Sequence, residues 1–230
     1  MALGISREMI YSLFQIGELQ PANLTEKEER TLKIWKRSSK RFLLVQHDGG
    51  GGGATIALSN LALALAKKYN VLVTFPTRGE MISFYESHPY ICNMQMNCDT
   101  EVFRNIILEA DVVLVNAVIN NNVIEMLHRY GKPFYLWLHD HQDIYDHSDC
   151  ECLKECMDHN VKLLAVSPKA MELFTAYIKS MPCLRFPLAI QDSGYCVRHK
   201  KANQITTIAV IGELCRIKGQ DILLDALEKI

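Results

Sequence analysis

The sequence lacks the features of a membrane-spanning, secreted or nucleic-acid-binding protein. It contains no uninterrupted apolar stretch of the ~18 residues that a membrane-spanning helix needs. Residues 1–20 lack the apolar core and the small-residue cleavage site of a signal peptide. The 25 Lys and Arg residues against 26 Asp and Glu residues give a formal net charge of -1, which provides no overall attraction for nucleic acid. We therefore expect a cytoplasmic protein without a nucleic-acid partner.

Two kinds of motif are also missing. No Gly-Lys-Ser or Gly-Lys-Thr follows a glycine-rich segment, which excludes a P-loop. The eight cysteines form no Cys-x-x-Cys pair of the kind found in structural zinc sites. Because cytosolic thiols stay reduced, we expect no structural disulfide. Soft ligands for a metal do gather along one segment, but half-buried thiols on a helix are the simpler interpretation and we expect no metal. These residues are His147, Cys150, Cys152, Cys156 and His159.

Composition and periodicity indicate a globular α/β protein. Of the 230 residues, 49% are hydrophobic and 22% are charged, close to globular averages. Short apolar runs alternate with amphipathic stretches, and each run is continuous, as in strands that helices cover on both faces. We therefore expect a parallel sheet. Its strands are predicted at 42–45, 71–75, 112–115, 134–138 and 161–166, and helices at 54–68, 99–108, 119–130 and after the N-cap Ser167 and Pro168.

The chain divides into four segments. Residues 1–40 predict a helical N-terminal extension, with one helix over about 6–19 and a second that opens at a capping box of Thr25 and Glu28. Residues 41–186 predict the sheet domain. The polar residues 187–204 predict a linker. Residues 205–230, with a strand at 208–211 and a helix over 219–230, predict the first strand-helix unit of an incomplete second domain.

Five consecutive glycines, Gly49 to Gly53, separate the first strand from its helix. Backbone amides and a helix N-terminus at such a junction attract phosphate or other anions, and glycine allows a ligand to approach the backbone. A flexible loop without a ligand is the alternative. A dinucleotide fingerprint can also be fitted to Gly49, Gly51 and Ala54, although Arg78 stands near the position where an acidic residue is expected.

Two His-Asp pairs follow strands of the predicted sheet. His47 and Asp48 come after the first strand, and His139 and Asp140 after the fifth. Open α/β sheets bind ligands at the carboxyl ends of their strands, so the pairs are expected to converge at that edge. Polar residues that bond to their own turns remain the alternative.

Residues 27–41 contain seven basic and two acidic residues around Trp35. Such a segment suits peripheral contact with an anionic membrane surface. A solvated helix face explains the same pattern.

Four short motifs, in this order and spacing, resemble those of one enzyme family. They are Gly52-Gly53-Ala54-Thr55, Gly131-Lys132-Pro133 leading into Trp137-Leu138-His139-Asp140, Ala165-Val166-Ser167, and Val210-Ile211-Gly212-Glu213-Leu214 with Lys218-Gly219-Gln220-Asp221. Together they resemble the N-terminal half of a family 4-type retaining glycosyltransferase of GT-B architecture. The resemblance covers about residues 41–230. It implies a Rossmann-like acceptor-side domain with helices on both faces, followed by a truncated nucleotide-sugar domain.

The resemblance also implies roles for particular residues. Gly52 and Gly53 would approach the donor diphosphate, and His139, the implied catalytic residue, would contact the donor sugar. Lys218 would bind the leaving diphosphate, with Arg216 in place of the arginine that other members carry directly before the lysine. A further departure is Glu213, where the family often has arginine.

The implied activity is retaining transfer of a sugar from a nucleotide-diphosphate sugar to a glycan, lipid-linked or small-molecule acceptor, without metal or other cofactor. The nucleotide pocket and the family's paired glutamates would lie beyond residue 230, so we expect this chain to be nearly inactive alone. Two other functions fit the residues. One is a nicotinamide-dependent oxidoreductase that uses Gly49, Gly51 and Arg78, and the other is a non-catalytic module that self-associates through Ile208–Ile211.

Overall fold

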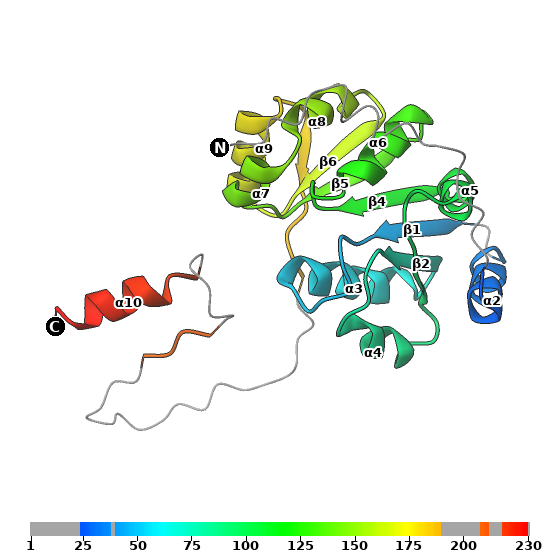
Figure 1. The fold of residues 1–230 in the computed structure, drawn as a ribbon, viewed down its shortest axis with the longest axis horizontal. Coiled ribbons are helices and arrows are strands. Elements are labelled where there is room, and N and C mark those ends of the chain that lie inside the picture. The colour runs from blue at the N-terminus through cyan, green and yellow to red at the C-terminus, as the bar shows by residue number, and fades with distance from the viewer. Residues whose placement is uncertain (1–23, 38–39, 190–207, 212–217, 230) are drawn as a thin grey trace, which may run out of the picture. The chain divides into compact units, whose positions relative to one another are not determined.

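The computed structural model describes residues 24–37, 40–189, 208–211 and 218–229 (Figure 1). The chain forms two compact units, Met1–Gln191 and Asp192–Ile230. The helix expected over 6–19, most of the expected linker and Arg216 lie outside the described residues.

The first unit is built on a seven-stranded sheet in which every pairing is parallel. The strand order is β3-β2-β1-β4-β5-β6-β7, so the chain winds outward from β1 to one edge and then crosses back to β4. The predicted parallel α/β sheet is confirmed. The strands are β1 (Arg41–Val45), β2 (Asn70–Phe75), β3 (Cys92–Gln95), β4 (Val112–Asn116), β5 (Phe134–Leu138), β6 (Val161–Ala165) and β7 (Cys183–Arg185).

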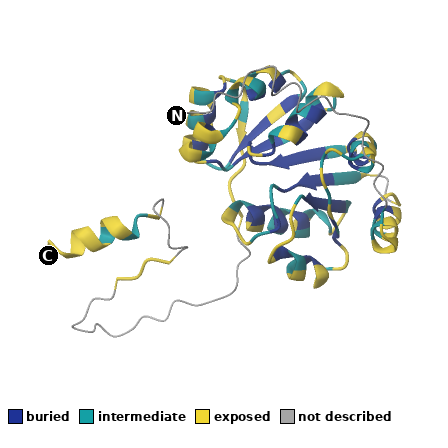
Figure 2. Cartoon of the chain, viewed as in Figure 1, coloured by how far each residue is buried: buried dark blue, intermediate teal, exposed yellow. Residues whose placement is uncertain are grey.

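Helices cover both faces of the sheet, and two separate apolar cores result (Figure 2). The smaller core lies under α3 (Gly53–Leu65) and α4 (Met81–Glu86). The larger core takes its residues from the remaining helices of this unit. These are α2 (Glu26–Trp35), α5 (Glu101–Glu109), α6 (Asn121–Arg129), α7 (Gln142–His147), α8 (Cys150–Cys156) and α9 (Pro168–Tyr177).

The two cores explain why β1 and its neighbours near the centre of the sheet are almost entirely apolar. In β1, Leu43 and Val45 belong to the larger core, whereas Leu44 between them belongs to the smaller one. Successive side chains of a strand point to opposite faces, so a strand covered on both sides has no solvent-facing position.

Local sequence signals fix the helix ends as predicted. The Thr25 hydroxyl accepts from the Glu28 amide at 3.3 Å, and the Glu28 carboxylate accepts from the Thr25 amide at 2.8 Å, which completes the capping box. The Ser167 hydroxyl accepts from the Ala170 amide at 3.2 Å, with Pro168 at the first helical position.

Helix α2 packs at the amino ends of β1, β2 and the edge strand β3. Trp35 is fully buried, and its indole nitrogen donates to the carbonyl of Phe42 at 3.1 Å. The Asn70 side chain, at the start of β2, donates to the carbonyl of Ile34 at 2.9 Å. This helix is therefore joined to the sheet at the edge opposite the carboxyl ends of the strands.

Three parts of the chain differ from the prediction. Residues 80–98, where the sequence pattern predicts no helix or strand, contain α4 and β3, and a short edge strand, β7, follows α9. The strand expected at Ile208–Ile211 is wrong, because these residues form no strand and are exposed. A single strand needs a neighbour to satisfy its backbone, and none pairs with it in the described part of the second unit. Helix α10 (Gln220–Leu227) does form close to the expected place.

Candidate functional site

The candidate site lies at the carboxyl ends of β1, β4 and β5, which are adjacent in the sheet. A buried amide network holds it together. The Gln46 side chain donates to the carbonyl of Thr55 at 3.0 Å, and Asn116 donates both to the side-chain oxygen of Gln46 and to the carbonyl of Ala54 at 2.9 Å. These bonds tie the first turn of α3 to two strands. Sequence reasoning missed both residues, although each is a polar residue at the end of an apolar run.

Gly49 is explained by packing within the chain. A Cβ there would lie 2.6 Å from the carbonyl oxygen of Thr77 and 2.8 Å from the amide nitrogen of Gly79. Gly79 in turn faces the backbone of Gly49. The two glycines allow the loops after β1 and β2 to touch, so ligand approach, the reason predicted from the sequence, is not needed at this position.

Gly52 and Gly53 are different, because the described chain leaves space beside both. A Cβ on Gly52 would meet only the Thr55 hydroxyl at 3.9 Å, and one on Gly53 would meet no described atom within 4 Å. No described side chain caps α3, so its first backbone amides have no side-chain acceptor among the described residues. An exposed, uncapped helix N-terminus of this kind can hold an anion.

Two carboxylates border the same loop. Asp48 accepts from the Gly50 amide at 2.8 Å, and a Cβ on Gly51 would lie 2.6 Å from a carboxylate oxygen of Glu80. An anion at α3 therefore has to sit away from Gly50 and Gly51, nearer Gly53.

His139 presents an uncharged imidazole at the end of β5. Burial, and then the nearby His47, lower its pKa from 6.5 to about 4. Its ring packs edge-on against Trp137, with the ring centres 4.3 Å apart. Its buried Nε2 has no hydrogen-bond partner in the described structure. A neutral imidazole with a free ring nitrogen can exchange a hydrogen bond with a ligand hydroxyl.

The two His-Asp pairs approach each other across the β4 loop. His47 Nε2 lies 3.3 Å from an Asp48 carboxylate oxygen. His47 acts electrostatically on the pKa values of both His139 and Asp140. The loops after β1 and β5 therefore lie close enough for a charge on one to change the pKa values of side chains on the other.

Asp140 has a structural contact of its own. It is 7% exposed, and its carboxylate accepts from the Val118 amide at 3.0 Å. Burial is the main cause that raises its pKa. The bond anchors the loop after β4 next to Ala117, whose φ of 79° is unusual for a residue other than glycine.

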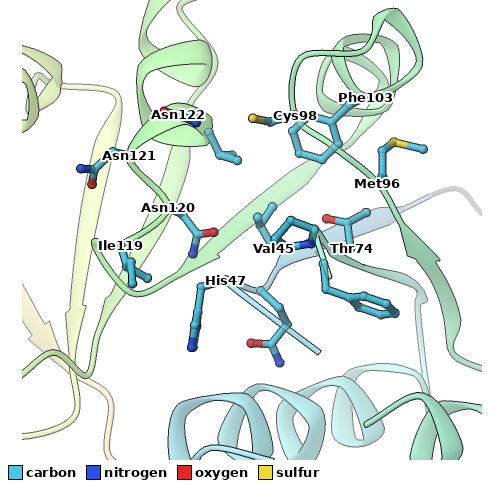
Figure 3. A pocket seen from close by; sticks show the side chains of 14 residues that line it. Val45, His47, Thr74, Met96, Cys98, Phe103, Ile119, Asn120, Asn121 and Asn122 are labelled. Carbon is cyan, nitrogen blue, oxygen red and sulfur yellow. The ribbon is translucent and has the colours of Figure 1, made fainter. Parts of the chain in front are cut away.

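A pocket of about 290 Å³ opens at the same edge, between the loops after β1 and β2 and the start of α6 (Figure 3). Several of its lining side chains belong to or pack against the larger core, so it lies on the sheet face opposite α3. Sequence reasoning did not find it. It is lined by Val45, Gln46, His47, Thr74, Phe75, Pro76, Met96, Cys98, Phe103, Ile119, Asn120, Asn121, Asn122 and Val123.

The cysteines and histidines near α8 do not assemble into a metal site. No group of three or more potential ligands comes together anywhere in the described residues. The Cys150 thiol donates to the carbonyl of Tyr145 at 3.3 Å, and His147 bonds through Nδ1 to the carbonyl of Asp143. Burial raises the pKa of Cys156 to about 12, which opposes the thiolate form that binds metal.

The three predicted cationic residues belong to different parts of the chain. Arg78 follows β2 and donates to the side chain of Gln95 at 3.1 Å. Lys218 is exposed at the start of α10 in the second unit, and Arg216 lies outside the described residues.

Fold and site together define a doubly wound parallel α/β domain whose carboxyl edge is suited to ligand binding. The chain matches no known protein family, no curated protein and no solved structure. Within the described ranges, no helix has the length and apolarity to cross a bilayer.

Proposed function

We propose that this chain is the acceptor-side part of a retaining glycosyltransferase that uses a nucleotide-diphosphate sugar. The observation that carries the proposal is His139, an uncharged imidazole whose Nε2 is unpartnered among the described residues, at the edge where α3 also begins. An imidazole that stays neutral suits contact with a sugar hydroxyl. The space beside Gly52 and Gly53, at an α3 N-terminus without a side-chain cap among the described residues, suits the donor diphosphate.

The chemistry follows from the charges that develop during transfer. Positive charge builds at the anomeric carbon and negative charge on the departing phosphate. Backbone amides at Gly53 stabilise that phosphate, and Lys218 and Arg216 are the cations that the sequence resemblance assigns to the same role. The leaving phosphate helps to take the proton of the acceptor hydroxyl, so the reaction retains configuration and has no need of a metal.

Calorimetry with UDP-glucose and GDP-mannose tests the donor site. We expect dissociation constants weaker than micromolar. Gly53→Ala fills the open space and lowers affinity about tenfold, whereas His139→Ala weakens binding of the nucleotide sugars but not of UDP or GDP. His141→Ala is the matched control, because His141 is exposed two residues further along. Submicromolar binding, or equal losses in both histidine variants, contradicts the proposal. Lys218→Ala tests whether the Lys218 ammonium group contributes to the affinity for the nucleotide sugars. Lys229→Ala, on another exposed lysine of the same unit, is its control.

The same proposal places the protein in the cytoplasm, with peripheral membrane contact through the basic segment 27–41, which includes most of α2. Cations of this segment are paired in the structure, for example Arg30 with Glu26 at 3.2 Å and Lys36 with Glu109 at 2.9 Å. Because α2 packs on the amino ends of the strands, a membrane beneath it would lie at the edge opposite the candidate site. This arrangement favours a water-soluble acceptor over a lipid-linked one.

A nicotinamide-dependent oxidoreductase is the second candidate, and the strand order favours it. The order β3-β2-β1-β4-β5-β6 is the one that binds dinucleotides at its switch point, and Arg78 follows β2, where a 2′-phosphate would lie. The packed Gly49 and the Glu80 carboxylate beside Gly51 oppose it. Fluorescence titration with NADPH discriminates, because saturable binding that Arg78→Ala weakens supports the oxidoreductase.

A non-catalytic interaction module is the third candidate. Its support is the exposed apolar surface of the second unit, where Ile211 is 96% exposed and Ile222 is 70% exposed.

A further inference from the structure

The pocket at the carboxyl edge lies on the opposite sheet face from the glycine loop. Phe103 and Val123, which line the pocket, belong to the larger core, whereas α3 packs on the smaller one. His47 stands between the two, since it lines the pocket and also pairs with Asp48, which binds the Gly50 amide. The sheet edge therefore offers two binding places, one on each face.

The described lining of the pocket offers a charged ligand no Asp, Glu, Lys or Arg side chain as a partner. Of the described residues that line it, none carries a carboxylate, an ammonium or a guanidinium group. A charged ligand would lose its hydration and find only the His47 imidazole, amide groups and the first turn of α6, whereas an uncharged ligand has no such desolvation cost. Neutral polar residues line the pocket instead, namely three consecutive asparagines, Asn120 to Asn122, and Thr74 (Figure 3).

The Thr74 hydroxyl is the clearest indication that the pocket can take a polar ligand. It is 1% exposed, lines the pocket, and its hydroxyl has no partner among the described residues. A buried hydroxyl without a partner is destabilising, so its retention at a pocket wall points to a group that arrives with a ligand. A ligand hydroxyl can both donate to and accept from it.

The size of the pocket limits the ligand. A volume of about 290 Å³ lies at the lower end of the range of small-molecule sites, which suits one ring rather than a chain of rings. The aromatic edge of Phe103 and the side chain of Met96 offer apolar contact, and Asn120 and Asn122 offer amides. A polyol ring fits such a lining, because its C–H faces are apolar and its edges carry hydroxyl groups.

We propose that this pocket binds one uncharged polyhydroxylated ring, a sugar or cyclitol without phosphate or carboxylate. The assignment of this pocket as the acceptor-binding site rests on the proposed function. Its preference for an uncharged ring is independent of that function. In the transfer reaction, an acceptor ring here would reach the glycine loop past His47.

Cysteine footprinting locates the ligand in the complete chain. Methyl glucoside, methyl mannoside and myo-inositol are the neutral probes, and glucose 6-phosphate, glucuronate and inositol 1-phosphate are their anionic counterparts. Cys98 lines the pocket and Cys183 lies outside it on β7. We expect at least one neutral probe at millimolar concentration to slow alkylation of Cys98 by iodoacetamide, with Cys183 unaffected and the anionic probes inactive. The glucoside and inositol arms separate a sugar from a cyclitol.

Two variants test the contacts by calorimetry with the probe that protects. Thr74→Val keeps the side-chain shape and removes the unpartnered hydroxyl, so we expect thermal stability to be unchanged or higher while affinity falls about fivefold, the value of one neutral hydrogen bond. Cys98→Met fills the pocket and abolishes binding. Thr77→Val, on an exposed residue outside the pocket, is the control and leaves affinity unchanged.

The possible outcomes separate this inference from the proposed function. Equal protection by neutral and anionic probes, no protection by any probe, or unchanged affinity in Thr74→Val would overturn it. Binding of neutral rings together with failure of nucleotide-sugar binding would leave the pocket assignment standing and remove the glycosyltransferase proposal.

Discussion

The five glycines after β1 show how one residue type serves two purposes within a few positions. Gly49 is buried against the loop after β2, and its role is to admit another stretch of backbone. Gly53 opens α3 with free space beside it. The sequence predicts the loop and its position but cannot separate these roles, because the partner of Gly49 is 30 residues away, at Gly79.

Substitution of two glycines by alanine should therefore have opposite effects. Gly79→Ala places a methyl group against the backbone of Gly49, and we expect a loss of about 1–3 kcal/mol in the free energy of unfolding, as in other overpacked sites. Gly53→Ala should leave stability unchanged or raise it by up to about 1 kcal/mol, because alanine favours a helix. Urea unfolding of both variants measures the difference, and equal stabilities would refute the packing of Gly49 against Gly79.

Burial of His139 should make stability depend on pH. Its pKa is about 4 in the folded protein against an ordinary value of 6.5, so the unfolded chain binds the proton more readily between these values. The stability that comes from keeping His139 uncharged is therefore fully present above pH 6.5 and is lost as the pH falls toward 4. Between pH 7 and pH 5 the loss amounts to about 2 kcal/mol. Denaturant unfolding at both pH values measures it.

His139→Asn serves as the control for this effect, since it keeps a polar group and cannot titrate. The raised pKa of Asp140 acts with the opposite sign, because its contribution falls as pH rises. The effect of His139 is therefore measured as the difference in the free energy of unfolding between the wild type and His139→Asn at each pH. Identical pH dependence in the two proteins would show that His139 is not protected from protonation.

At the scale of elements, the central strands were predictable and the edge strands were not. β5, FYLWL, is a continuous apolar run at the centre of the sheet. β3, CNMQ, and β7, CLR, are the two edge strands, and they are short and partly polar. An edge strand has a neighbour on one side only and less apolar surface to bury, so its sequence carries a weaker signal.

Helix α2, predicted as part of an extension, should unfold together with the sheet. Trp35→Ala removes a fully buried indole and its bond to Phe42, and we expect a loss of about 3–5 kcal/mol. Ile34→Ala, on a side chain that is 49% exposed, is the neighbouring control and should change stability by less than about 0.5 kcal/mol. In Trp35→Ala the remaining tryptophan is Trp137 on β5, so its fluorescence reports the sheet. If the sheet of Trp35→Ala unfolds with the same free energy as that of the wild type, α2 does not stabilise the sheet.

At the scale of the whole molecule, the sequence predicted which loops share an edge but not how they divide between its faces. Parallel strands bring the segments after β1 and β5 to one edge, and this follows from the strand pattern alone. The pocket depends on Thr74, Met96 and Phe103, which come from separate elements and are ordinary core residues in sequence. Such a site becomes visible only when the three-dimensional arrangement is known.

The second unit should drive self-association. Helix α10 has no buried residue, and Ile222 and Leu224 are 70% and 64% exposed. Apolar surface of this kind is stabilised by contact with another molecule. We therefore expect Ile222→Lys combined with Leu224→Lys to shift sedimentation toward the monomer. Both tryptophans, Trp35 and Trp137, lie in the first unit, so their fluorescence shows whether that unit keeps its stability. A wild-type chain that sediments as a monomer at all concentrations would remove the association hypothesis.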